Sequence, residues 1–158
     1  MNGAPSVPSV RLATPADAER IGQLLHDFNT EFDDPTPGPE AVAYRIRRLL
    51  EAGEITVLLA GREACGLAVL RFRPALWKEA LECYLEELYV VPDRRGRGTG
   101  RALMEAAIEL ARERGAGDMH LATAEDDIAA RALYESLGFD NRGGRPGGPP
   151  EYFYEREL

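Results

Sequence analysis

The chain has 158 residues, of which 44% are hydrophobic and 29% are charged, and this is the composition of an ordinary globular domain. It contains no run of about 18 apolar residues, which excludes a transmembrane helix, and its start does not have the pattern of a signal peptide. The formal net charge of −8 argues against a nucleic-acid partner and is compatible with a cationic substrate such as a polyamine. We expect a disordered leader over residues 1–9 and one domain over residues 10–158.

The two cysteines, Cys65 and Cys83, lie inside apolar runs. They are too few for a disulfide framework or a cysteine-rich metal site, and no spacing of His, Cys and Asp resembles a metal site. Free cysteine is often simply buried, so both are interpreted as structural. We therefore predict no metal and a reducing, cytoplasmic location.

The first fifty residues predict a short strand followed by two helices. Val10–Leu12 has the character of a strand, and Thr14 as N-cap with Pro15 at the first helical position starts a helix. Apolar residues then recur at i, i+3, i+4 and i+7, as on one buried helix face. The proline-rich run at 33–39 ends this helix, and a second helix is predicted over about 40–52.

The rest of the chain alternates between strand and helix patterns, which indicates an α+β fold built on a mixed sheet. Two strands joined by a Gly-containing hairpin turn at 61–63 come first. The predicted strands are 55–60, 64–72, 81–91, 119–123 and 152–157, and the predicted helices are 99–114 and 127–137.

A glycine-rich turn links the strand that ends near residue 91 to the helix that follows. Its sequence is Arg95-Gly96-Arg97-Gly98-Thr99-Gly100, with Arg101 next. Glycines let the backbone approach a ligand closely, and a helix start offers N–H groups and a positive dipole end. The turn therefore predicts a site for a phosphate or pyrophosphate. It lacks the third glycine of a dinucleotide-binding G-x-G-x-x-G and the G-K-[ST] of a P-loop, so both of those alternatives are weak.

Two sequence motifs, which follow each other along the chain in the expected order, resemble those of a known family. Arg95, Gly98 and Gly100 match [Q/R]-x-x-G-x-[G/A], and residues 130–139 match A-x-x-L-Y-E-x-L-G-F about forty residues later. In these motifs the chain resembles the GNAT superfamily of N-acetyltransferases. The resemblance implies a twisted, mixed but mostly antiparallel sheet of six to seven strands with helices on both faces.

The resemblance also implies acetyl-CoA as the acetyl donor. The backbone of three strand residues would pair with the pantetheine arm, and the N–H groups of the glycine-rich turn would hold the pyrophosphate. Asp127 stands where the family commonly has an Asn that contacts the cofactor; an ionised Asp can accept a hydrogen bond or cap a helix, but it cannot donate. The implied cofactor-binding residues are Leu88, Tyr89, Val90, Arg95, Gly96, Arg97, Gly98, Thr99, Gly100, Arg101 and Asp127.

The reaction requires a base for the acceptor amine and an acid for the leaving thiolate. Tyr134, in the second motif, is the predicted acid because its phenol is neutral and can donate. Glu86 is the predicted base, since polyamine-type relatives place a functional glutamate in a similar segment. Glu87 is the weaker choice, because neighbours on a regular strand point to opposite faces.

Two rival functions remain open at this level. A GNAT-like protein that binds acyl-CoA without catalysis would serve as a sensor, and an unrelated nucleotide-binding domain would prefer NAD or ATP. The acceptor is also open, although a small-molecule amine or a polyamine is favoured over a protein amine. A homodimer is possible, and no membrane partner is expected.

Overall fold

The computed structural model of the chain describes residues 6–158. The predicted leader falls partly on residues 1–5, which lie outside the described residues, and residues 6–9 are neither helix nor strand. The chain separates into two compact units, the first ending at Leu121 and the second running over Ala122–Leu158. Each unit is described by itself.

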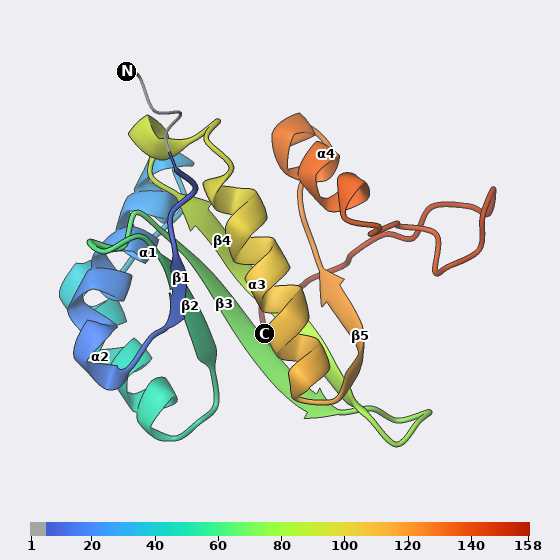
Figure 1. The fold of residues 1–158 in the computed structure, drawn as a ribbon, viewed down its shortest axis with the longest axis horizontal. Coiled ribbons are helices and arrows are strands. Elements are labelled where there is room, and N and C mark those ends of the chain that lie inside the picture. The colour runs from blue at the N-terminus through green and yellow to red at the C-terminus, as the bar shows by residue number, and fades with distance from the viewer. Residues whose placement is uncertain (1–5) are drawn as a thin grey trace. The chain divides into compact units, whose positions relative to one another are not determined.

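The first unit contains a five-stranded sheet in which strand order follows chain order (Figure 1). The first four strands pair antiparallel and the fifth pairs parallel with the fourth, so the sheet is mixed and mostly antiparallel, as predicted. Its strands are β1 (Val10–Leu12), β2 (Thr56–Ala60), β3 (Gly66–Pro74), β4 (Leu81–Val90) and β5 (Ala116–Leu121).

Three helices cover the two faces of this sheet. α1 (Ala18–Glu31) and α2 (Pro39–Glu51) share one hydrophobic core with alternate residues of β2 and β3. α3 (Thr99–Glu113) packs on the opposite face, where the position of a Cβ on Gly66 would lie 3.2 Å from the Leu103 side chain. The helices predicted from the apolar periodicity are therefore present. Apolar side chains of β2 and β3 point alternately to the two faces of the sheet, so each face forms a hydrophobic core with the helices that cover it.

α1 and α2 lie unusually close where they cross. A Cβ on Gly22 of α1 would come within 2.7 Å of Ala43 of α2, so only glycine fits at this contact. The predicted start at Thr14 and Pro15 is a 3-10 turn, Pro15–Asp17, that leads directly into α1. The Thr14 N–H donates to Asp17 Oδ2 at 2.8 Å, and the Arg11 guanidinium beside that carboxyl lowers its pKa to about 2.

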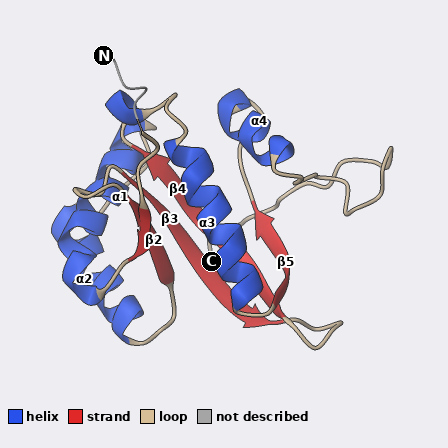
Figure 2. Cartoon of the chain, viewed as in Figure 1, coloured by secondary structure: helices blue, strands red, loops and turns tan. Residues whose placement is uncertain are grey.

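The second unit consists of α4 (Ile128–Ser136) and a long segment without regular structure (Figure 2). The predicted strand at 152–157 is wrong, and the sheet has five strands instead of six to seven. The segment alternates like a strand, but a strand also needs a ladder partner. Among the described residues it has none, and Tyr152, Phe153 and Tyr154 are 74%, 66% and 86% exposed.

Candidate functional site

β4 changes its register where its two halves meet. Val69 of β3 lies opposite Glu87, but the next residue, Leu70, lies opposite Leu85. Glu86 is therefore an extra residue in β4, and the pairing contains a β-bulge. The bulge reverses the usual alternation, because Glu86 and Glu87 now follow each other on the same side of the strand.

Beyond the bulge, one edge of β4 is open. Parallel pairing with β5 ends at Leu85, so in residues 6–158 the last part of β4 has only β3 as a neighbouring strand. The N–H of Val91 donates to the chain just before β3 at 2.9 Å. Backbone groups point alternately to either side, so those of Tyr89 point toward β3 and those of Leu88 and Val90 point away from it. An extended ligand can thus add to this edge as a strand would.

The glycine-rich turn begins just after this open edge. A 3-10 turn, Pro92–Arg94, leads to Gly96 and Gly98, whose φ angles of 71° and 81° are strained for any residue with a Cβ. Gly98 is the N-cap of α3, and the first N–H groups of a helix have no acceptor within it. Thr99, 3% exposed, anchors the helix start beneath the turn. The helix start thus offers backbone N–H groups of the kind that bind phosphate, and binding of a pyrophosphate here stays a prediction.

The Arg95 side chain lies against the protein instead of extending from the turn. Its Nε donates to the carbonyl oxygen of Val90 at 2.8 Å, and its two terminal nitrogens donate to the Glu31 carboxylate of α1 at 2.6 and 2.7 Å. Its Cζ lies 5.5 Å from the centre of the Tyr89 ring. Arg95 therefore connects the end of β4, the glycine-rich turn and the last residue of α1.

The two glutamates at the bulge have different environments. Glu86 is exposed and forms an ion pair with Arg71 at 2.5 Å. Glu87 is half-buried, and burial, with repulsion from Glu86 and Asp34, raises its pKa to about 7. A carboxyl with that pKa exchanges its proton readily at neutral pH, which is the property required of a general base.

The segment that follows α1 is hydrogen-bonded to the helix and carries a carboxylate whose charge acts on Glu87. Asn29 Nδ2 donates to the Pro35 carbonyl at 2.8 Å, and His26 Nδ1 lies 3.1 Å from Thr36 Oγ1. Its carboxylate at Asp34 is close enough to contribute to the raised pKa of Glu87. This face of the first unit is therefore acidic and suits a cationic group.

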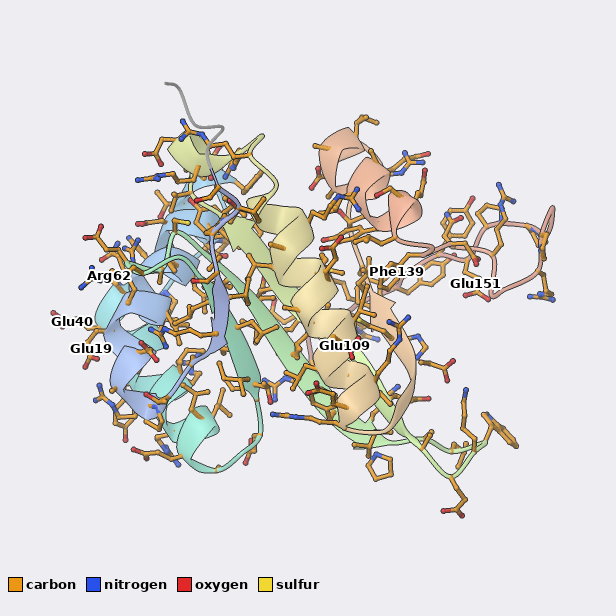
Figure 3. The ribbon with its side chains drawn as sticks, in the orientation of Figure 1. Glu19, Glu40, Arg62, Glu109, Phe139 and Glu151 are labelled. Atoms are coloured by element: carbon orange, nitrogen blue, oxygen red, sulfur yellow. The ribbon has the colours of Figure 1, made fainter. Side chains whose placement is uncertain are left out.

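The remaining predicted site residues lie in the second unit. Asp127 is the N-cap of α4, and its Oδ1 accepts a hydrogen bond from the Ala130 N–H at 3.1 Å. Tyr134 of α4 is 8% exposed, and the centre of its ring lies 6.1 Å from that of Phe139 in an edge-on arrangement. Phe139, just after the helix, is labelled in Figure 3. Both Asp127 and Tyr134 have structural roles within this unit, and their predicted roles in catalysis and cofactor binding stay predictions.

Comparisons with known proteins agree with this geometry. The model of the acetyltransferase (GNAT) family matches residues 19–139. The chain belongs to this family. It is 30% identical over 141 residues to the aminoglycoside N(6′)-acetyltransferase type 1 of Stenotrophomonas maltophilia, with 85% of this chain and 88% of the relative covered. The resemblance stated from the two motifs is confirmed.

Solved structures give the same assignment. A protein of Arthrobacter sp. FB24, proposed to be an acetyltransferase, is 46% identical with a TM-score of 0.88, and 99% of this chain and 100% of that chain are covered. The aminoglycoside acetyltransferase HMB0005, from an uncultured soil metagenomic sample, is 26% identical with a TM-score of 0.74, covering 97% and 99%. The chain therefore has a GNAT-like α+β fold.

Within the first unit, the structure brings together the open edge of β4, the glycine-rich turn and the two glutamates at the bulge. The sequence-based preference for Glu86 over Glu87 assumed unbroken alternation, and the bulge removes that assumption. A signal was present in the sequence: the apolar Cys83 and Leu85 stand at odd positions before the two glutamates, whereas the apolar Leu88 and Val90 stand at even positions after them. No helix in residues 6–158 is long and apolar enough to cross a membrane, and no cluster of ligating side chains there could hold a metal ion.

Proposed function

We propose that this GNAT-family protein transfers an acetyl group from acetyl-CoA to an amine of a cationic small molecule. The observation that carries the proposal is the continuity of an open strand edge with a helix N-terminus, on the same sheet as an acidic face that contains a carboxyl group of raised pKa. One arm of acetyl-CoA is a chain of amides and the other is a pyrophosphate. Their chemistry matches the strand edge and the helix end in the same order.

On the donor side, the outward N–H and carbonyl groups of Leu88 and the outward N–H of Val90 would pair with the pantetheine amides. The backbone N–H and carbonyl of Tyr89 point toward β3, so Tyr89 would not bond the pantetheine arm directly. It would hold Leu88 and Val90 in place through its pairing with β3. The turn from Gly96 to Arg101 would hold the pyrophosphate through its N–H groups, with Arg97 and Arg101 adding positive charge.

On the acceptor side, a protonated amine would be attracted by the acidic face and would lose its proton before attack. An alkyl ammonium has a pKa near 10, so it is mostly protonated at neutral pH. Glu87 is the proposed base, because its raised pKa of about 7 lets it take up and release a proton. Glu86, the base expected from the sequence, is held by Arg71 and would orient the cation.

Completion of the transfer requires a hydrogen-bond donor and a proton donor. The bound acetyl-CoA supplies an activated acyl group, and the amine nitrogen forms the new bond to its carbonyl carbon while the carbon–sulfur bond breaks. The outward N–H of Val90 would stabilise the carbonyl oxygen. Tyr134 would donate its proton to the departing sulfur, an assignment that rests on the family motif. Cys83 is buried and burial raises its pKa to about 11, so an acyl-enzyme on this thiol is disfavoured.

The acceptor class is supported by charge and by the relatives. The chain has a net charge of −8, and the charge of Asp34 contributes to the raised pKa of Glu87. The Stenotrophomonas maltophilia relative is named for aminoglycosides, which are cationic amines. We therefore favour a small-molecule amine, including a polyamine, over a protein amine or a nucleic acid. A cytoplasmic location, a possible homodimer and one domain over 10–158 remain part of the proposal, and the family match extends across both units.

The first experiment is calorimetry with acetyl-CoA on the wild type and on Gly98→Glu, which places a bulky anion at the phosphate turn. Gly115→Glu is the matched control, because Gly115, just past the opposite end of α3, has a φ of 82° against 81° at Gly98. We expect micromolar binding that is lost in Gly98→Glu and kept in Gly115→Glu. A folded wild type that does not bind would refute the donor assignment.

Turnover separates the enzyme from the silent alternative. Release of the CoA thiol would be followed with a panel of amines, beginning with polyamines and aminoglycosides. Acetylation of any member supports the enzyme. Acetyl-CoA binding without turnover on the whole panel would favour a GNAT-fold sensor, in which Glu87 and Tyr134 have no catalytic task.

A further inference from the structure

Arg95 occupies the first position of the pyrophosphate motif, yet its guanidinium is directed at protein atoms. We propose that Arg95 is a positioning residue which ties the glycine-rich turn to α1 through Glu31, and that Glu31 thereby supports binding of the CoA pyrophosphate. The inference rests on the proposed function and assigns a task to a residue outside the motif. Glu31 is the last residue of α1, 64 positions before Arg95.

The contacts of Arg95 close the turn at its base. Val90 is the last residue of β4, and its carbonyl oxygen accepts from Arg95 Nε at 2.8 Å, across five positions of chain. The neighbouring Val91 is fixed by its own backbone hydrogen bond to Cys65. One guanidinium therefore sets the distance from the end of the strand to Gly96, where the pyrophosphate site begins. Each guanidinium nitrogen donates to a protein acceptor, so three of its five N–H groups are directed at the protein.

α1 holds the opposite side of the guanidinium. Both terminal nitrogens donate to Glu31, and the Tyr89 hydroxyl hydrogen-bonds to the same carboxylate. The hydrogen bond from Arg95 is the main reason why the pKa of Glu31 is lowered, so the carboxylate stays charged at neutral pH. Phe28, one turn earlier in α1, stacks on the Tyr89 ring at 5.0 Å. Helix, strand and turn are thus joined through one cluster of four side chains.

Because Glu31 is negatively charged, a neutral substitution there distinguishes two explanations by whether CoA binding becomes stronger or weaker. A carboxylate beside a pyrophosphate site repels the ligand, so simple electrostatics predicts that its neutralisation strengthens CoA binding. Positioning predicts the opposite result, because Glu31→Gln removes the bidentate acceptor and releases the turn. The side chains of Glu31 and Arg95 are 28% and 42% exposed, so the effect will be moderate.

The test compares two ligands on three proteins. CoA binding would be measured by calorimetry, and binding of pantetheine, which has no pyrophosphate, by NMR titration. The variants are Glu31→Gln and the control Glu19→Gln, which neutralises another α1 carboxylate that is ion-paired, in its case with Arg47 of α2 (Figure 3). We expect Glu31→Gln to weaken CoA binding about 3- to 10-fold and to leave pantetheine binding unchanged, while Glu19→Gln changes neither.

A second variant keeps the test decisive if Glu31→Gln unfolds. Arg95→Gln should produce the same selective loss, and the double variant should lose no more than either single variant, because both remove one interaction. Unchanged or tighter CoA binding by folded Glu31→Gln overturns the inference alone. Absence of CoA binding by the wild type refutes the proposed function, and the inference with it.

Discussion

The two halves of β4 are built from the same kind of sequence but have different surroundings. Leu81–Leu85 lies between β3 and β5, and its alternate residues, including Cys83, are buried under α3. Residues 86–90 have β3 on one side only, among the residues described, and carry the bulge. The first half contributes core and the second half contributes backbone groups and carboxylates to the proposed site.

This difference between the two halves of β4 shows how one strand can provide an open edge for a ligand and still contribute to the hydrophobic core. A strand edge with open N–H and C=O groups is a hazard for aggregation unless it is short or covered. Here the open edge is five residues long, and Arg95 already occupies the carbonyl of Val90. The bulge shifts the register of β4 against β3 at the position where the open edge begins, and the pairing with β3 continues beyond it.

The largest expected effect concerns the carboxyl in the second half. Glu87→Gln should lower kcat about 10²- to 10³-fold, because the amide cannot accept the proton of the amine. The pKa of Glu87 is raised to about 7, so the wild-type carboxyl is protonated below that pH and ionised above it. Activity of the wild type should therefore rise through about pH 7, and this step should be absent in the variant. The measurement is kcat against pH with the best amine of the panel.

The control lies in the first half of the same strand. Glu82→Gln removes a carboxylate that is ion-paired with Arg73 at 2.7 Å, and it should leave the pH profile unchanged. Glu87→Gln should also fold at pH 8, because ionisation of a carboxyl with a raised pKa costs stability as pH rises from about 4.5 to 7. Loss of activity confined to Glu86→Gln would return the role of base to Glu86.

The second prediction concerns stability. Leu85 is 3% exposed in the first half, whereas Leu88, in the second half, is only partly buried. Leu85→Ala should lower the free energy of unfolding by about 3 kcal/mol and Leu88→Ala by about 1 kcal/mol, because only the first leaves a full cavity. Urea unfolding measures both. Equal losses would contradict the division of β4 into a core half and a site half.

The sequence predicted much of this arrangement and missed specific parts for physical reasons. Periodicity and caps predicted the four α-helices and five strands found in residues 6–158, since local pattern and burial agree there. The strand at 152–157 failed because alternation does not supply a ladder partner. The motif predicted the phosphate turn at Gly98, but the partner of Arg95 could not be predicted, because the contact with Glu31 joins segments 64 positions apart.

The smallest expected effect concerns the two glycines at the ends of α3, and it distinguishes a loss of binding caused by backbone strain from one caused by loss of ligand contacts. Gly98 and Gly115 lie at opposite ends of the helix with φ of 81° and 82°, so an alanine at either position is strained by about 1 kcal/mol. Both variants should therefore lose similar stability in thermal unfolding. Only Gly98→Ala should weaken acetyl-CoA binding, about 5- to 10-fold, because relief of its strain moves the N–H groups at the start of the helix. If Gly115→Ala weakens binding equally, the loss follows from general destabilisation, and the helix start has no special part in holding the donor.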